Sequence, residues 1–275
     1  MSSTSPRIVL IGAGKMGQAM IKGWLTQGMS AASITAIDPH PSEELTTMAQ
    51  ATGFALNPSS PITPADVLIL AVKPQIYTEA AQHLKSFIGP STLIMSIMAG
   101  KTIEAIARGL GIGVNDYAIV RAMPNTPAAI GRGIAGLCAN PCTNDAQRAR
   151  AQNILSATGK TIWVETESMI DAVTALSGSG PAYVFYLVEA LAQAGTSLGL
   201  SPDLAMALAR TTVEGSGALL SETSDISAAQ LRINVTSPAG TTAAALDVLM
   251  AHDGLQPLLT RALTAARDRA RALAH

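Results

Sequence analysis

Three glycines near the start of the chain have the spacing of a phosphate-binding turn. Gly12, Gly14 and Gly17 form the pattern G-x-G-x-x-G, directly after the apolar run 8–11 and before apolar residues that recur at helical spacing. The first glycine permits a tight turn, the second lets backbone approach a pyrophosphate, and the third lets the helix pack on the strand. The helix start also favours negative charge. This context predicts a dinucleotide site; the alternative is three glycines that serve packing alone.

A carboxylate follows the next extended run. Asp38 ends the run 33–37, about 20 residues beyond the glycine turn. A carboxylate at that place can accept hydrogen bonds from a ribose 2′-hydroxyl and repels a 2′-phosphate, and no Lys or Arg lies nearby to offset it. We therefore predict that NADH is favoured over NADPH. The alternative is that Asp38 only caps the turn Pro39–Pro41.

A second cluster of hydrogen-bonding side chains lies near the C-terminal end, in the segment 234–242. Ser237, Thr241 and Thr242 flank the turn 238–240, which leads into a helical pattern. Hydroxyls and unpaired N–H groups at a helix start suit a carboxylate. Thr242 could also bond the ring nitrogen of a small cyclic imine. The alternative is a capped helix start that binds no ligand.

The second half of the chain is poor in side chains that could deliver a proton. No lysine follows Lys160, and no histidine lies between His83 and His252. Reduction of a ketone needs a proton for the developing alkoxide, commonly from Lys, His or Tyr. A protonated iminium carries its own proton into the reaction. The composition of this half therefore favours hydride transfer to a C=N bond.

Strands that could position these groups alternate with helices through the first half. The apolar runs 66–72 and 92–97 are typical of parallel strands buried on both faces. Because ligands bind at the carboxyl ends of such strands, the turns Ala71–Pro74 and Met98–Gly100 should face the dinucleotide. Asn125 follows a third run between two prolines, where its amide could orient a nicotinamide or substrate group, or form an Asx turn. Residues 131–138 and 162–164 indicate two further strands.

No strand-like run follows Val164, and the remaining residues fall into amphipathic helices. Two of them begin with helix-start signals, at Ser179–Pro181 and Ser201–Asp203. Their many small and apolar side chains favour packing against a second copy of the chain. We predict an α/β protein with an N-terminal Rossmann dinucleotide-binding domain over 1–164 and an all-α substrate-binding and dimerisation domain over 165–275.

Composition argues against several other classes of protein. The net charge is −1 and no basic run occurs, so nucleic acid is not an expected partner. Cys138 and Cys142 have no neighbouring His or Cys cluster, so neither a metal site nor a disulfide framework is expected. The first residues lack a targeting pattern, and no apolar stretch reaches the roughly 20 residues of a membrane span. We expect a soluble, cytoplasmic enzyme.

Five motifs together resemble those of the pyrroline-5-carboxylate reductases, in the same order and at about the same spacing over essentially the whole chain. They occupy residues 12–16, 71–75, 123–127, 175–183 and 234–242. The last two are the specific ones, since the dinucleotide pattern alone fits many families. The resemblance implies reduction of 1-pyrroline-5-carboxylate to L-proline with NAD(P)H, the last step of proline biosynthesis. It also implies a helical domain that interleaves in a homodimer, and assembly of such dimers into a decamer.

The resemblance also implies the site residues. Those on the cofactor would be Ile11, Gly12, Ala13, Gly14, Lys15, Met16, Asp38, Asn57, Ala71, Val72, Lys73, Pro74, Met98, Ala99 and Gly100. Ser237 and Thr241 would hold the substrate carboxylate, with Thr242 as the catalytic contact near its nitrogen. Glu167 and Asn234 match positions near the active site.

The chain departs from the family at two positions. The family's Ser-Pro-Gly-Gly is Ser-Pro-Ala-Gly at 237–240. If the third residue needs a positive φ, Ala239 must be strained or the turn altered, and we expect the turn to tolerate it. Many relatives have a small hydroxyl or basic residue in place of Asp38, so use of NADPH by this chain is in question.

Two other functions fit parts of the pattern. One is a different imine-reducing or hydroxyacid dehydrogenase of the same two-domain build. The hydroxyacid branch would need a lysine on the helix after Gly180, where the chain has Ala182, Tyr183 and Val184. The other is a non-catalytic dinucleotide-binding regulator, which would have no reason to retain the segment 237–242.

Overall fold

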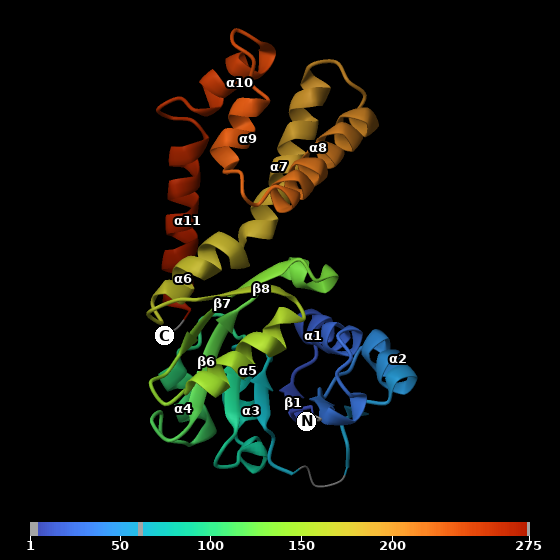
Figure 1. Ribbon diagram of the computed structural model, residues 1–275, viewed down its shortest axis with the longest axis vertical. Helices are drawn as coiled ribbons and strands as arrows, with labels where there is room; N and C mark the ends of the chain where they lie inside the picture. Colours follow the sequence, from blue (N-terminus) through green and yellow to red (C-terminus); the bar gives the residue numbers. More distant parts are fainter. Residues whose placement is uncertain (1–4, 60–62, 274–275) are drawn as a thin grey trace. The chain divides into compact units, whose positions relative to one another are not determined.

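The computed structural model describes residues 5–59 and 63–273, and it divides the chain into two compact units (Figure 1). The first unit comprises residues 1–179 together with 266–275, and the second comprises residues 180–265. Within the described residues, no helix combines the length and the apolar composition needed to cross a membrane.

The first unit is built on one eight-stranded sheet in the order β3-β2-β1-β4-β5-β6-β7-β8. All neighbouring pairs are parallel except β6 and β7, which are antiparallel. The strands are β1 (Ile8–Ile11), β2 (Ile34–Ile37), β3 (Ala55–Leu56), β4 (Val67–Leu70), β5 (Leu93–Ser96), β6 (Ala118–Met123), β7 (Gly133–Ala139) and β8 (Gly159–Trp163). Strand order reverses at β1, which pairs with both β2 and β4, and such a switch point is where open α/β sheets bind ligands.

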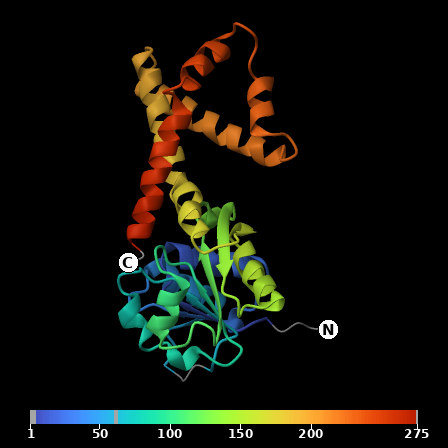
Figure 2. The same ribbon diagram turned by 90° about the vertical axis from the view of Figure 1, so that its left-hand side faces the viewer.

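Helices cover both faces of this sheet (Figures 1 and 2). One face carries α1 (Lys15–Thr26), α2 (Glu43–Thr52) and α5 (Asp145–Ser156), whose buried side chains form one core cluster with the strands. The other face carries α3 (Tyr77–Ala81) and α4 (Ile103–Leu110), which form a second cluster. The inner strands are buried throughout because both faces are covered, as the continuous apolar runs predict. The predicted Rossmann architecture is confirmed.

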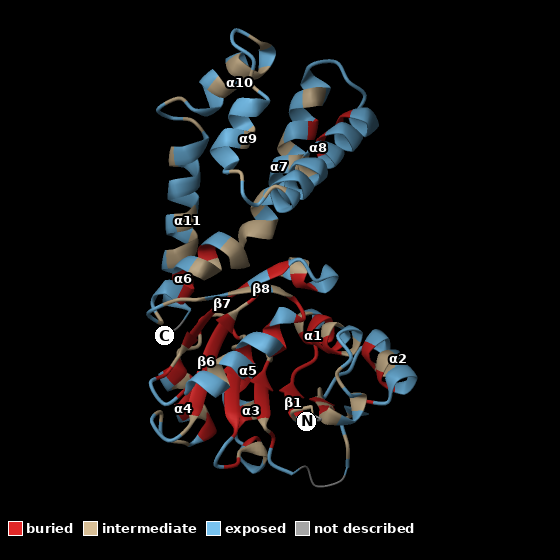
Figure 3. Ribbon diagram, viewed as in Figure 1, coloured by how far each residue is buried: buried red, intermediate tan, exposed pale blue. Residues whose placement is uncertain are grey.

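The second unit contains helices only. They are α7 (Gly180–Ser197), α8 (Pro202–Glu222), α9 (Ala228–Asn234), α10 (Thr241–Leu249) and the first part of α11 (Leu255–Ala272). The small buried residues Ala192, Ala205 and Ala209 bring α7 and α8 together. Most of the remaining helical surface is exposed (Figure 3), including large apolar side chains such as Phe185 at 62% and Tyr186 at 68%. This unit therefore buries little apolar surface within a single chain.

The two compact units divide between Ser179 and Gly180. The loss of strand pattern in the sequence instead indicates a domain boundary between residues 164 and 165. Helix α6 (Met169–Val173) and the π-helical turn 174–178 belong to the first unit because they pack on its sheet. Val173 fills the space above Gly136 of β7, where an added Cβ would lie 2.7 Å from the valine Cγ1. The last turns of α11 return to the first unit as well.

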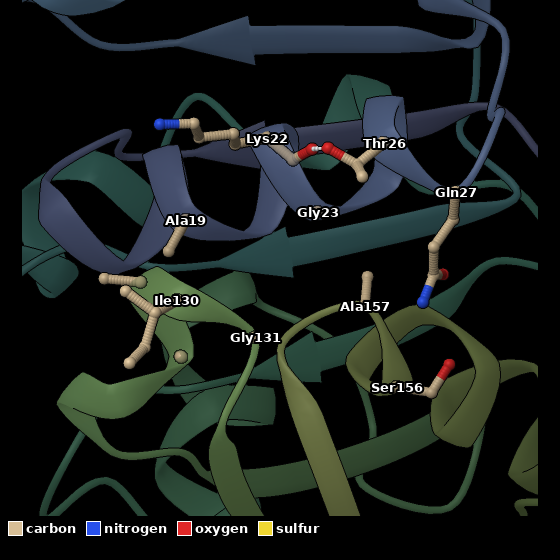
Figure 4. Close-up of a pocket in the computed structure, with 11 residues that line it drawn as sticks. Ala19, Lys22, Gly23, Thr26, Gln27, Ile130, Gly131, Ser156 and Ala157 are labelled. Carbon is tan, nitrogen blue, oxygen red and sulfur yellow. Dashed lines mark hydrogen bonds between the residues drawn. The ribbon is translucent and has the colours of Figure 1, made fainter. Parts of the chain in front are cut away.

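The contact between α1 and the end of α5 permits only glycine at position 23 (Figure 4). A Cβ on Gly23 would clash with the carbonyl oxygen of Ala157 and lie 3.0 Å from the carbonyl carbon. The neighbouring Trp24 is fully buried and donates to the Ile154 carbonyl at 2.8 Å.

We predict that Gly23→Ala lowers the free energy of unfolding by about 1–3 kcal/mol, because α1 must move off α5. The control is Lys22→Ala on the exposed side of the same helix, which should change it by less than about 0.5 kcal/mol. Urea unfolding at one protein concentration measures both variants. Equal stability of the two variants would show that the contact is loose.

Candidate functional site

The glycine turn between β1 and α1 has the shape that a pyrophosphate requires. Gly12 has φ +84°, and a Cβ there would lie 2.8 Å from the Ala71 carbonyl oxygen, so this turn packs directly on the turn after β4. Gly14 is open, with no atom within 4 Å of an added Cβ. Gly14 is also the N-cap of α1, and no side chain caps the helix. The first N–H groups of α1 are therefore available to an anion, and the residues present fit a dinucleotide.

The carboxyl ends of four strands meet beside this turn. The register pairs Ile11 with Ile37 and Leu70, and Leu70 with Ser96. The remaining cofactor residues predicted around these ends are Ala13, Lys15 and Met16 after β1, Ala71, Val72, Lys73 and Pro74 after β4, and Met98, Ala99 and Gly100 after β5. The structure thus brings together the turns that the apolar runs predict at one edge of the sheet.

Asp38 holds backbone groups on both sides of the strand end. Its Oδ1 accepts the His40 N–H at 2.9 Å, as a cap of the following turn does. Its Oδ2 accepts the Ala13 N–H of the glycine turn at 2.8 Å. Each carboxylate oxygen can accept a second hydrogen bond, so the predicted contact with a ribose hydroxyl is compatible with both bonds. The link to Ala13 was not predicted.

Asn57 fixes the backbone of Asp38. Its Oδ1 accepts the Asp38 N–H at 2.9 Å, and its Nδ2 donates to the Asp38 carbonyl at 2.7 Å. Asn57 itself has φ +47°, a conformation that asparagine tolerates better than most residues. The predicted cofactor residue Asn57 therefore orients the predicted cofactor residue Asp38.

Asn125 braces a turn. Its Oδ1 accepts the Ile134 N–H at 2.9 Å and so joins the end of β6 to the start of β7. Among the described residues its Nδ2 has no hydrogen-bond acceptor. The Asx-type role is thus present, and a ligand contact through Nδ2 stays a prediction.

Glu167 lies against the start of α4. Its Oε1 accepts the Ile103 N–H at 2.7 Å and receives Nη1 of Arg121 at 3.2 Å, whereas Oε2 has no hydrogen-bond partner in the described part of the chain. Glu167 also lines a cavity of about 360 Å³ together with Ile103 and Cys138. Burial raises the pKa of the Cys138 thiol, and the negative charge of Glu167 adds to that rise.

Sequence reasoning missed the partners of Glu167. Arg121 lies inside β6, where its side chain is 3% exposed, and it also contacts Asp171 at 3.5 Å. Arg271 lies 3.7 Å from the other oxygen of Asp171. The one signal in the sequence was an arginine within the apolar run 118–123, a position that needs buried acidic partners.

The second unit contains the predicted substrate turn, and its helix start has no side-chain cap. Gly240 is the N-cap of α10, its N–H bonds the Ser237 carbonyl at 3.1 Å, and no side chain bonds the first turn of the helix. The hydroxyls of Ser237, Thr241 and Thr242 have no hydrogen-bond partner among the described residues. Asn234 ends the preceding helix α9 and accepts a hydrogen bond from Gln230 at 2.8 Å. The described residues therefore do not show the alternative for α10, a helix start capped by a side chain.

The described residues of the two units contain no cluster of titratable side chains suited to a metal ion. No group of three or more His, Cys, Asp or Glu residues that could hold an ion occurs within residues 5–59 and 63–273.

Comparison with known proteins adds to this geometry. Residues 167–273 match the family described as "Pyrroline-5-carboxylate reductase dimerisation", and residues 7–111 match the family described as "NADP oxidoreductase coenzyme F420-dependent". A pyrroline-5-carboxylate reductase of Pseudomonas aeruginosa is 40% identical over 272 residues, which cover 98% of each chain. The chain belongs to the pyrroline-5-carboxylate reductase family. This confirms the family and the oxidoreductase class predicted from the five motifs.

Two solved structures of the family agree with the fold. The pyrroline-5-carboxylate reductase of Coxiella burnetii has a TM-score of 0.90 and 36% identity, with 98% of this chain and 99% of that chain covered. The Plasmodium falciparum enzyme, solved with NADP bound, has a TM-score of 0.79 and 26% identity over the full length of both chains. The dimerisation family begins close to the predicted domain boundary, whereas the compact units divide after Ser179. It also accounts for the exposed apolar helices of the second unit.

The substrate turn contains a residue in an unfavourable conformation. Ala239 has φ +56°, in the region where a non-glycine residue costs about 1–2 kcal/mol. The alanine at this departure from the family's Ser-Pro-Gly-Gly therefore has a positive φ, which strains a residue other than glycine.

We predict that Ala239→Gly raises the free energy of unfolding by up to about 1 kcal/mol, because relief of the positive φ outweighs the greater freedom of glycine in the unfolded chain. Ala243→Gly, inside α10, should instead lower it by about 0.5–1 kcal/mol. Thermal unfolding at a fixed protein concentration gives both values. Loss of stability in both variants would mean that position 239 bears no strain.

Proposed function

We propose that this protein reduces 1-pyrroline-5-carboxylate to L-proline with NADH or NADPH. The observation that carries the proposal is the uncapped start of α10, where unbonded hydroxyls and N–H groups form a receptor for a small carboxylate. Family membership over nearly the whole chain supports the substrate, and the open Gly14 turn supports the dinucleotide.

The nicotinamide cofactor, when bound, supplies a hydride. The chain's own residues orient the substrate for it. Ser237 and Thr241 donate hydrogen bonds to the substrate carboxylate, next to the positive end of the α10 dipole. Thr242 accepts a hydrogen bond from the N–H of the protonated imine. When the hydride adds to carbon, the C=N electron pair moves to nitrogen and gives a neutral amine, so no side-chain acid is needed.

The test is the oxidation of NADH and NADPH, followed at 340 nm, by the purified full-length protein. Turnover with 1-pyrroline-5-carboxylate and none with 2-keto acids, with or without ammonia, is the expected result. Turnover with a keto acid alone would indicate a hydroxyacid dehydrogenase, and turnover that needs ammonia would indicate reductive amination. The proposal fails if 1-pyrroline-5-carboxylate oxidises neither cofactor.

We further propose that the second units of two chains pair through their exposed apolar helices to form at least a homodimer. The family match over residues 167–273 and the many exposed Leu, Phe and Val side chains of α7–α11 support this. Assembly of such dimers into a decamer is an extension of the same proposal. Light scattering coupled to gel filtration distinguishes a monomer, which would contradict the proposal, from a dimer or a decamer.

Thr242→Ala should lower kcat about tenfold or more while the Kd for NADH changes less than about twofold, because the substitution removes a substrate contact alone. Thr242→Ser keeps the hydroxyl and should retain most of the activity. Thr236→Ala is the matched control, since the Thr236 hydroxyl already bonds the Arg232 carbonyl at 2.6 Å. Steady-state kinetics and NADH fluorescence provide the two constants; a parallel loss of both would place Thr242 in the cofactor site instead.

We propose that Asp38 makes NADH the favoured cofactor. Asp38→Asn removes the charge and leaves oxygen and nitrogen atoms near the Ala13 and His40 N–H groups, whereas Asp38→Ser removes both the charge and the bridge. In both variants the ratio of kcat/KM for NADPH to that for NADH should rise about fivefold or more, since the repulsion of a 2′-phosphate is lost. An unchanged ratio in both would mean that Asp38 serves only the two turns.

A further inference from the structure

Arg121 is the one buried cationic side chain in the described part of the chain. It lies on β6 opposite Ser96 of β5 and Cys138 of β7, on the face of the sheet that α4 and α6 cover. Removing a guanidinium from water is unfavourable unless its partners compensate for the lost hydration. The groups that the Arg121 side chain binds should therefore explain why an arginine occupies an apolar strand.

The guanidinium and its partners link three segments of the first unit, namely strand β6, residues 167–171 and the end of α11. Nη1 lies 3.2 Å from Oε1 of Glu167, and Nη2 lies 3.5 Å from Oδ1 of Asp171 on α6. The second oxygen of Asp171 lies 3.7 Å from Nε of Arg271 in the last turn of α11. We call these four residues the Arg121 cluster.

The Arg121 cluster reaches the turn Met98–Gly100 from two sides. Glu167 accepts a hydrogen bond from the N–H of Ile103, the first residue of α4. Only two residues separate Ile103 from the end of the turn. Leu273, two residues beyond Arg271, lies against Gly100, where an added Cβ would be 3.2 Å from the Leu273 carbonyl oxygen. Gly100 itself has φ +71°. Both flanks of the turn are therefore tied to one buried arginine.

Stability alone does not explain such a cluster. Replacing a buried ion network by apolar residues of similar volume is often neutral or stabilising, because desolvation offsets the Coulomb attraction. Geometry is a better explanation, since displacing a reacting group by about 1 Å can cost on the order of a hundredfold in rate. The turn tied by this cluster is one of the two after β4 and β5 that are expected to face the dinucleotide.

We propose that Arg121 is a positioning residue for hydride transfer, which sets the turn Met98–Gly100 through Glu167 on one side and through Asp171 and Arg271 on the other. The inference rests on the proposed function. It assigns to Glu167 a role in holding α4, in addition to any contact that its Oε2 makes with substrate. Arg121 itself touches neither substrate nor cofactor in this account.

The experiment compares three variants of the cluster, Arg121→Lys, Arg271→Ala and Arg271→Lys, with the control Arg269→Ala. Arg269 is an exposed arginine at the same end of α11, and it has no ion-pair partner among the described residues. Two measurements are made on each: steady-state kinetics with NADH binding, and hydrogen–deuterium exchange of the peptide 98–105 without cofactor. The exchange measurement reports on the Ile103 amide whether or not the protein turns over substrate.

Arg121→Lys should lower kcat about tenfold and Arg271→Ala about threefold, with the Kd for NADH within about twofold, because only the turn is displaced. Both should speed exchange in residues 98–105 and leave residues 8–17 unchanged. Arg271→Lys should restore most of the loss, and Arg269→Ala should match the wild type.

Wild-type kcat and wild-type exchange in Arg271→Ala and Arg121→Lys, with only a lower melting temperature, would overturn the proposal. If Arg121→Lys does not fold, the two Arg271 variants decide the outcome. Failure of the proposed function is separate, because it would appear as absent turnover in the wild type, while the exchange pattern of the variants would still test the cluster.

Discussion

The chemistry of this protein depends on helix starts whose backbone N–H groups are not bonded by side chains. The N-cap residues of α1 and α10 are Gly14 and Gly240, and no described side chain caps either helix, whereas α2, α4, α5 and α9 are capped by Ser, Thr or Asn. An uncapped start costs about 1 kcal/mol relative to a capped one. In the function proposed above, each start receives an anion: the glycine turn before α1 receives a pyrophosphate, and the hydroxyl-lined turn before α10 receives a carboxylate.

Elsewhere, polar side chains bond backbone to keep these starts in place. Asn57 bonds the backbone of Asp38, and the Asp38 carboxylate bonds the backbone of the glycine turn. A chain of hydrogen bonds therefore runs from the end of β3 to the turn before α1. On the far side of the switch point, the Arg121 cluster does the same for the turn after β5. The turn before α10 contains a strained residue as well, since Ala239 has φ +56°.

Local patterns predicted most of the fold and the glycine turn, because a strand, a tight turn and a helix start are each specified by adjacent residues. The turn before α10 was located in the same way, and its contact with substrate stays a prediction. The roles of Asp38 and Asn125 could not be settled from the sequence, since capping and ligand binding require the same residue types. The Arg121 cluster was missed because its members meet only where α6 packs on β6 and β7 and where the end of α11 returns to the first unit, in contacts that join residues 46 or more positions apart.

The central claim is that the start of α10 binds a carboxylate, and the most direct measurement is the NMR shift of the Thr241 and Thr242 backbone amides during titration of the full-length protein with L-proline. Both amides should move with L-proline and stay in place with pyrrolidine, which has the same ring without the carboxylate. Amides that do not move at saturating L-proline, or that move equally with pyrrolidine, would contradict the account.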